Sequence, residues 1–139
     1  MKNRTKSLAC IMVAVALLLS MSVVAFAYSG TFSFQITNGV TGSYKHTLVA
    51  NKAVVVKSRA ETYVKVNGGT TTNYRSYRVG IQRKGSLLMW GTNTHKADGS
   101  STSYTYAASR IIAGTYRAEV NVTNASSTYE IVGSGTIKQ

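Results

Sequence analysis

Alternation of apolar and polar residues is the feature of this sequence that most restricts its fold. In residues 31–37, Phe32, Phe34 and Ile36 alternate with polar side chains, and residues 115–122 alternate in the same way. Successive side chains of a β-strand point to opposite faces, so these segments predict strands with one buried face. Proline is absent from the sequence, and glycine, asparagine and serine cluster between the alternating segments, where turns are expected.

The alternating pattern recurs along the chain and predicts a series of short strands. Residues 87–90 are fully apolar, and we expect them to be buried, whereas residues 91–103 are expected to form a polar loop. No segment has the period of an amphipathic helix, although residues 108–114 could form one helical turn. We expect eight or nine strands, and the candidate segments are residues 31–37, 44–50, 52–59, 62–66, 74–84, 87–90, 103–107, 115–122, 127–132 and 135–138.

Short strands joined by short connections favour one fold class. We expect an all-β protein, an antiparallel β-sandwich of immunoglobulin-like or jelly-roll-like type, because two packed sheets bury the apolar faces economically. A closed barrel is the alternative. The order of the strands within the sheets does not follow from the sequence.

The start of the chain has the pattern of a secretory signal peptide. Cations within the first six residues precede an apolar stretch over residues 8–27, and Ala25 and Ala27 supply the small residues that signal peptidase requires. An uncleaved membrane anchor is the alternative, because about 20 apolar residues can span a bilayer. We expect residues 1–27 to be removed and residues 28–139 to form a single secreted or wall-associated domain without a transmembrane span.

The mature domain is expected to be free of disulfides and strongly basic. The only cysteine, Cys10, precedes the expected cleavage site, and a disulfide-free exported domain favours a bacterial source. Of 16 lysines and arginines, three lie in residues 1–27, so 13 oppose four acids in residues 28–139, which is a net charge of +9. Such a charge attracts an anionic polymer or an anionic membrane surface, although it could serve solubility alone.

Basic residues and tyrosines share the outward positions of several expected strands. If those strands are neighbours, one sheet face presents cations beside aromatic rings, which together bind sugars, phosphates or carboxylates. The alternative is that the outward positions of a basic protein simply carry such residues. The predicted binding residues are Lys57, Arg59, Tyr63, Lys65, Tyr74, Arg78 and Arg117.

The acids and histidines do not form the pattern of an enzyme. His95 and Asp98 could form a triad with a serine, but no nucleophile elbow accompanies them. Glu119 and Glu130 could pair across a hairpin like the carboxylates of a glycosidase, yet isolated acids are more often surface charges. Two distant histidines and no cysteine in the mature chain make a metal site or cofactor unexpected.

These observations favour a secreted, non-enzymatic, basic β-sandwich protein that binds anionic cell-envelope or extracellular polymers. No catalytic residue, metal or cofactor is expected, and no specific nucleic acid is expected as a partner. The alternative is a secreted antibacterial, bacteriocin-like or membrane-active toxin, because small cationic exported proteins reach anionic membranes readily.

Overall fold

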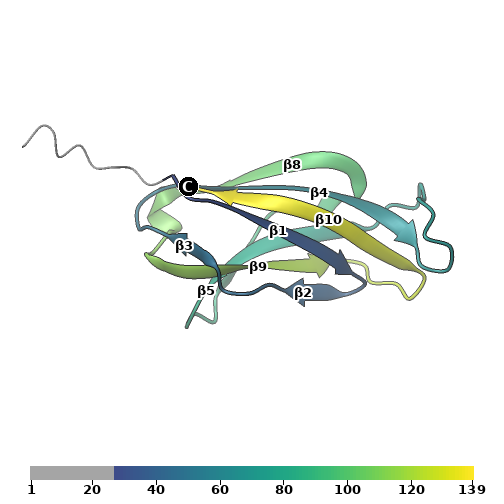
Figure 1. Cartoon of the computed structure of the whole chain (residues 1–139), viewed down its shortest axis with the longest axis horizontal. Helices are drawn as coiled ribbons and strands as arrows, with labels where there is room; N and C mark the ends of the chain where they lie inside the picture. Colours follow the sequence, from purple (N-terminus) through teal and green to yellow (C-terminus); the bar gives the residue numbers. More distant parts are fainter. Residues whose placement is uncertain (1–26) are drawn as a thin grey trace, which may run out of the picture.

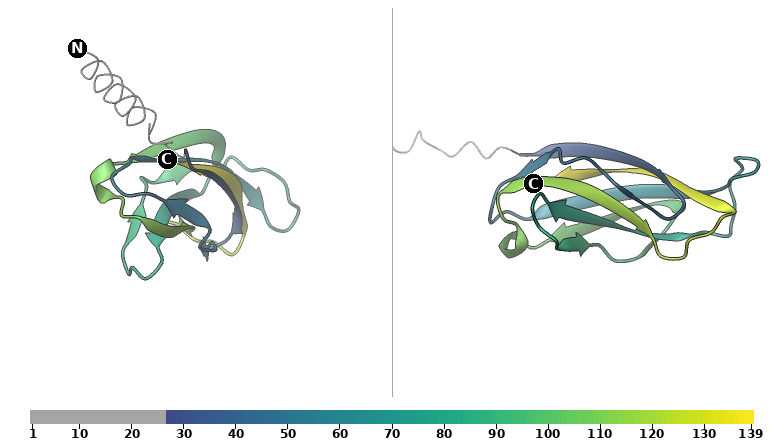
Figure 2. Two further views of the ribbon diagram at one scale, coloured as in Figure 1. Left: turned by 60° about the vertical axis from the view of Figure 1, so that its left-hand side comes forward. Right: turned by 90° about the horizontal axis from the view of Figure 1, so that it is seen from below.

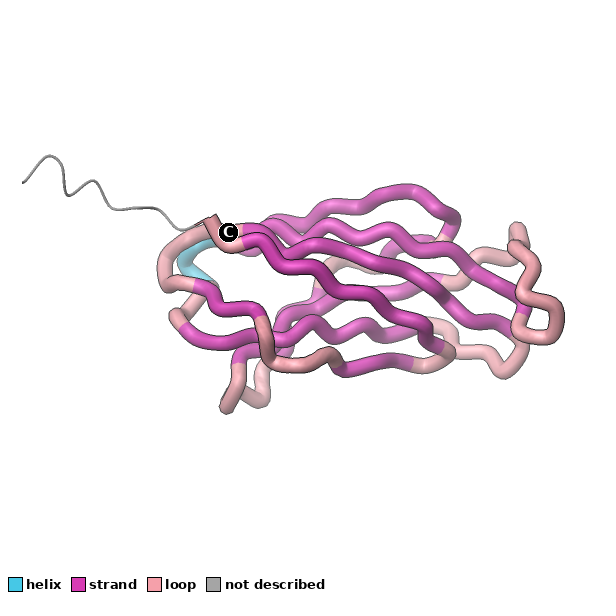
Figure 3. Tube along the Cα trace, in the orientation of Figure 1, coloured by secondary structure: helices cyan, strands magenta, loops and turns pink. Residues whose placement is uncertain are grey.

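A computed structural model describes residues 27–139, and most of them lie in β-strands (Figures 1 and 3). The expected signal peptide at residues 1–27 lies, except for Ala27, outside the described residues. The elements are β1 (Ser29–Ile36), β2 (Gly39–Thr41), β3 (His46–Leu48), β4 (Val54–Val64), β5 (Ser76–Arg83), β6 (Met89–Gly91), β7 (His95–Lys96), β8 (Asp98–Tyr106), the short helix η1 (Ala108–Arg110), β9 (Gly114–Val122) and β10 (Tyr129–Lys138).

The strands form two sheets that pack face to face (Figures 1 and 2). Sheet A has the order β1-β10-β4-β8, and sheet B has the order β2-β9-β5-β6, with β3 also paired to β9 and β7 also paired to β5. Every pairing between named strands is antiparallel. The prediction of an all-β antiparallel sandwich is therefore confirmed.

The interior is built from the alternating positions that the sequence indicates. In β1, Phe32, Phe34 and Ile36 are buried, while the residues between them are exposed. In β5 of the facing sheet, Tyr77 and Val79 are fully buried. Each large apolar side chain removed from water contributes about 1.5–3 kcal/mol, which explains why alternation dominates the fold.

Two glycines in β10 make room for the aromatic rings of β1. The register pairs Phe32 with Gly135 and Phe34 with Gly133, and a Cβ atom at either glycine would collide with the facing ring. The glycines therefore lie within one continuous strand, Tyr129–Lys138, in place of the two separate strands that we expected there. Packing against the neighbouring rings compensates for the low strand propensity of glycine.

Two further expectations are corrected. Residues 52–59 and 62–66 were expected as two strands, but β4 is one strand, Val54–Val64. The expected polar loop at residues 91–103 instead contributes β7 and the first half of β8. In β8, Gly99 has a φ of 85°, and the register with β4 shifts at this point. A glycine with positive φ allows such a bulge, so the strand continues where a turn was expected.

The apolar segment at residues 87–90 is not buried. Leu87 is 99% exposed and Leu88 is 70% exposed. The backbone N–H of Ser86 donates to the carbonyl of Arg83 at 3.0 Å, and Gly85 has a φ of 81°, so a tight turn ends β5 just before the leucines. The two leucines therefore belong to the β5–β6 turn, where no second sheet covers them.

The start and the end of the described chain lie side by side. The backbone N–H of Gln139 donates to the carbonyl of Tyr28 at 2.9 Å, and Figure 1 shows the C-terminus next to the start of β1. Within residues 27–139, no helix has the length and apolar character needed to cross a membrane.

Candidate binding surfaces

The predicted binding residues are distributed over both outer faces of the sandwich and one of its ends. Lys57, Arg59 and Tyr63 occupy alternate positions of β4 and lie on the outer face of sheet A. Lys65 lies in the turn that follows β4, and Tyr74 lies in the connection that leads to β5. These five residues are close in sequence, but only the first three share a sheet face.

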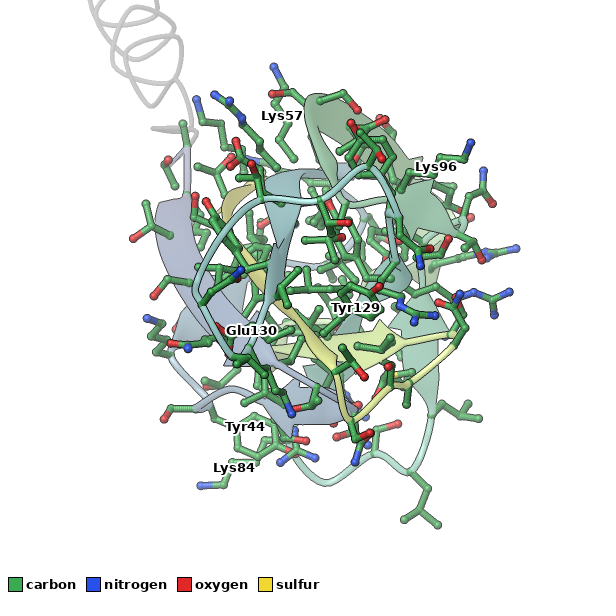
Figure 4. The ribbon with its side chains drawn as sticks, turned by 90° about the vertical axis from the view of Figure 1, so that its right-hand side faces the viewer. Tyr44, Lys57, Lys84, Lys96, Tyr129 and Glu130 are labelled. Atoms are coloured by element: carbon green, nitrogen blue, oxygen red, sulfur yellow. The ribbon has the colours of Figure 1, made fainter. Side chains whose placement is uncertain are left out.

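The remaining two predicted residues, Arg78 and Arg117, lie on the outer face of sheet B. The expected single face is therefore divided, because the connection between β4 and β5 carries the chain from one sheet to the other. In Figure 4, Lys57 lies on one side of the molecule, and Tyr44, whose ring lies beneath the guanidinium of Arg117, lies on the opposite side. Ligand binding by the seven residues remains a prediction.

The outer face of sheet A carries an open depression of about 360 Å³, which we call the hydroxyl-lined groove. The central strands β10 and β4 and the edge strand β8 supply its side chains. Its outward cationic and hydroxyl-bearing residues are Lys57, Arg59, Lys138, Ser101, Ser134 and Thr136, whereas the hydroxyl of Ser58 points inward and bonds to that of Tyr77.

The long cations of the groove stand among short hydroxyl side chains. In the sheet register, Lys57 is flanked by Thr136 of β10 and by Ser103 of β8, and Arg59 is likewise flanked by a serine on each side. Short neighbours leave the cationic head groups uncovered and add hydroxyl donors beside them. An anionic group that approaches this face therefore meets both charges and hydrogen-bond donors.

Neighbouring acidic side chains neutralise little of the positive charge in the groove. Arg59 pairs with Glu61 at 3.3 Å, and both side chains are substantially exposed, so this ion pair contributes little to stability. Within residues 27–139, neither Lys57 nor Lys138 has an acid within ion-pair distance. Both lysines are therefore available to an external anion.

The groove continues across the sheet towards β1. A second depression of about 420 Å³ shares Ser134 and Thr136 with the first and extends to Thr31, Ser33 and Lys45. Together the two depressions form a shallow track from β8 to β1, with hydroxyl groups along it, three cations in the first depression and Lys45 in the second. An elongated ligand lying on this track would cross the strands of sheet A.

Two acids, Glu61 and Asp98, lie beyond Arg59 near the end of β4. Glu61 and Asp98 lie opposite each other in the register, and they line a separate depression of about 320 Å³ that also includes Tyr74. Hydrogen bonds from the side chain and the backbone of Ser100 hold the pKa of Asp98 below its usual range. Tyr63 donates its hydroxyl proton to Glu61 at 2.8 Å, which raises the pKa of the phenol.

On the outer face of sheet B, the side chain of Arg117 contacts several neighbouring side chains. Its Nε donates to the side-chain oxygen of Gln82 at 2.9 Å, and its Nη2 lies 2.8 Å from a carboxylate oxygen of Glu119. Its guanidinium also lies over the ring of Tyr44, 4.7 Å from the centroid. Arg117 therefore connects β9 to β5 and has little capacity left for a ligand.

Neither histidine forms a catalytic arrangement in the described part of the chain. His46 is buried, and its Nδ1 lies 2.7 Å from the hydroxyl of Tyr28. Burial lowers the pKa of His46, and the charge of Lys45 lowers it further. His95 packs beside the buried ring of Tyr77, and no hydrogen bond links it to Asp98 among residues 27–139.

The acids also remain apart. Glu119 lies on β9 and Glu130 lies on β10, which belong to different sheets, so the two carboxylates are not neighbours across a hairpin. In the described portion of the chain, no cluster of three or more histidine, cysteine or acidic residues is arranged to hold a metal ion.

Sequence reasoning missed most of the groove. It did not single out Lys45 or Lys138 as binding residues, nor the hydroxyls of Ser134 and Thr136. A signal exists in the alternate hydroxyl residues of the segment 101–105. Serine and threonine are so frequent in this chain that the pattern becomes informative only once β8, β4 and β10 are known to be adjacent.

No protein-family model matches the sequence, and no curated protein shows significant similarity to it. Several solved structures are similar to it at low TM-scores. A family 16 carbohydrate-binding module-2 has a TM-score of 0.43 at 10% identity, over 74% of this chain and 71% of that one. PliG of Aeromonas hydrophila, a periplasmic inhibitor of g-type lysozyme, has a TM-score of 0.42 at 14% identity, and the match covers 86% of this chain and 93% of PliG. The mitogen YPM of Yersinia pseudotuberculosis has a TM-score of 0.38 at 8% identity, and the match covers 80% of this chain and 84% of YPM. At these values the likeness concerns the β-fold and carries no information on ligand or activity.

Proposed function

We propose that this protein is a secreted, non-enzymatic binding protein whose hydroxyl-lined groove holds an anionic polymer of the cell envelope or the extracellular space. The observation that carries the proposal is the pair Lys57 and Lys138, which lack acidic partners within residues 27–139 and line a floor of serine and threonine hydroxyls. The expected net charge of +9 adds long-range attraction for such a partner.

The shape of the groove favours a polymer over a small molecule. Small-molecule sites are usually concave pockets that enclose most of the ligand. The groove is open, and it continues into the depression beside Lys45, so that successive anionic groups along a chain can contact successive cations. Several weak contacts made by one chain act together, which gives useful affinity without an enclosed pocket.

Retention on immobilised polyanions tests the proposal. The protein is applied to heparin and to wall teichoic acid at low salt and is eluted with a salt gradient. The variant Lys57→Glu/Lys138→Glu should elute far earlier than the wild type. Lys84→Glu/Lys96→Glu is the matched control, because it makes the same change of charge at two exposed lysines of sheet B and its β5–β6 turn. Equal loss of retention in both variants would show that net charge alone causes retention, and it would refute the groove as the binding site.

A membrane-active or antibacterial toxin is the second candidate, and one observation favours it. The β5–β6 turn exposes Leu87 and Leu88 to solvent, and contiguous exposed apolar surface can mark a site of membrane interaction. Dye leakage from anionic vesicles and killing of bacteria would support this function. Membrane binding without leakage or killing would exclude it and leave the polymer-binding function in place.

A further inference from the structure

An apolar surface stands at one end of the sandwich, away from the groove. Leu87 and Leu88 come from the β5–β6 turn, and Ile112, which is 53% exposed, comes from the connection between β8 and β9. We call these three residues the leucine tip. The turn projects beyond sheet B below β5 in Figure 1.

The backbone of the β5–β6 turn is fixed by hydrogen bonds. In addition to the tight turn from Arg83 to Ser86, the side-chain amide of Gln82 donates to the carbonyl of Ser86 at 3.0 Å. The backbone N–H of Leu88 donates to the hydroxyl of Ser86 at 3.1 Å. The leucines are therefore presented by a turn with defined internal contacts, and their exposure does not result from a lack of local structure.

A cavity of about 180 Å³ lies beneath the tip. Leu88, Trp90 and Ile112 line it together with the buried side chains of Ile81 and Tyr116. Trp90 is only partly buried, so an apolar group that covers the tip also changes the surroundings of its indole.

Cations surround the leucine tip. Arg83 is the last residue of β5, Lys84 begins the turn that carries the leucines, and Arg110 precedes Ile112 by two residues. The side chain of Arg83 lies against Gly114 and lines the cavity. Within residues 27–139, none of these three cations forms an ion pair. Apolar side chains ringed by free cations match the surface of an anionic bilayer, where hydrocarbon lies directly beneath negative head groups.

We propose that the leucine tip docks on an anionic lipid bilayer. Leu87 and Leu88 enter the boundary between head groups and acyl chains, and Arg83 and Lys84 bind the phosphates above it. A second copy of the chain fits the tip less well, because self-association would bring these cations and two domains of high positive charge together. A polyanionic carbohydrate would contact the cations but would leave the leucines exposed to water.

The fluorescence of Trp90 provides a direct measurement, because it is the only tryptophan in the chain. The protein is mixed with vesicles of equimolar phosphatidylcholine and phosphatidylglycerol, with and without bromine on the acyl chains. We expect a blue shift of the emission and quenching by the brominated lipid. Vesicles of phosphatidylcholine alone should bind much more weakly, because the cations then lack a negative surface.

Three variants locate the contact. Leu87→Ser/Leu88→Ser should lower the vesicle affinity about tenfold or more, since two exposed apolar side chains are lost. Val66→Ser is the matched control, because Val66 is 91% exposed in the turn that follows β4, at the other end of β5. Lys57→Glu/Lys138→Glu alters the groove only and should still bind vesicles, so that failure of the polymer-binding function and failure of this proposal are distinguishable.

Several results would overturn the proposal. One is that brominated lipid does not quench the tryptophan of the wild-type protein. Another is that Leu87→Ser/Leu88→Ser binds vesicles as well as the wild type, and a third is that Val66→Ser loses as much binding as the double leucine variant. Sedimentation that shows a dimer abolished by Leu87→Ser/Leu88→Ser would assign the tip to self-association instead. Circular dichroism of each variant checks that the fold is retained.

Discussion

Lys138 of β10 lies diagonally across from Lys57 of β4 on the outer face of sheet A, two positions beyond Thr136, which pairs with Lys57. Diagonal neighbours on adjacent strands are about 7–8 Å apart, so their side chains reach the same bound group. Like charges in such positions repel each other unless an anion lies between them. The two lysines therefore do not stabilise the fold by their own interaction, and their placement suits the binding of an anionic group between them.

The salt dependence of heparin binding should depend on these two lysines. Each cation that contacts a polyanion releases about one counterion, so Lys57→Ala/Lys138→Ala should reduce the slope of log affinity against log salt by about two. Titrations at several sodium chloride concentrations measure the slope. Lys84→Ala/Lys96→Ala serves as the control and should keep the wild-type slope. An unchanged slope in the groove variant would mean that its lysines do not contact the polymer.

Arg117 should matter for stability and not for polymer binding. Arg117→Ala removes the contacts to Gln82, Glu119 and Tyr44, and we expect it to lower the free energy of unfolding by about 1–3 kcal/mol. Urea denaturation provides the value, and heparin retention of the folded variant should match that of the wild type. Arg78→Ala, which loses one hydrogen bond to Thr94, should cost less. Heparin binding that falls with Arg117→Ala while stability is unchanged would restore Arg117 as a binding residue.

Gly135 should be intolerant of a side chain. A Cβ atom there collides with the ring of Phe32 and the carbonyl of Lys57, so Gly135→Ala should lower the free energy of unfolding by about 1–3 kcal/mol. At Gly91 nothing lies within 4 Å of the corresponding position, and Gly91→Ala should change stability by less than about 0.5 kcal/mol. Thermal or urea unfolding compares the two variants. Equal effects would show that β10 and β1 are not packed as described.

Stability should decrease in mild acid because of His46. Burial and the charge of Lys45 lower the pKa of this histidine in the folded state, whereas the unfolded chain has the ordinary value near 6.5. The unfolded state therefore binds the proton more readily, and stability is lost as the pH falls below about 6.5, at up to about 1.4 kcal/mol per pH unit for one group. His95, whose pKa is also lowered by burial, contributes in the same direction.

Urea denaturation of His46→Gln between about pH 7.5 and about pH 5 isolates this contribution. The variant should be less stable than the wild type at neutral pH, because it loses the contact with Tyr28. Its stability should change less with pH than that of the wild type, with the remainder due to His95. A variant with the full wild-type pH dependence would show that His46 is not the group that titrates.

The sequence predicts the fold class well because burial of alternate residues is a local pattern. Phe32, Phe34 and Ile36 indicate their strand without any knowledge of their partners, and the structure confirms it. The same reasoning fails for Leu87, because an apolar run is equally compatible with a buried strand and with an exposed turn. Only the position of the tight turn at Gly85 distinguishes the two cases.

The binding surface was less predictable because it depends on which strands are adjacent. Lys57 and Arg78 both occupy outward positions, but β4 and β5 belong to different sheets, so the two cations lie on opposite faces. Lys138, by contrast, comes close to Lys57 only through the pairing of β10 with β4, which are far apart in the chain. Long-range pairing of this kind has no local signature in a single sequence.

The most direct test of the account is to map the contact by backbone amide chemical shifts while heparin is added to labelled protein. We expect the amides of Lys57, Ser134, Thr136 and Lys138 to shift together and to saturate at one ligand concentration, with sheet B unaffected. Shifts that are confined to the outer face of sheet B, or spread evenly over the surface, would contradict the assignment of the hydroxyl-lined groove as the polymer site.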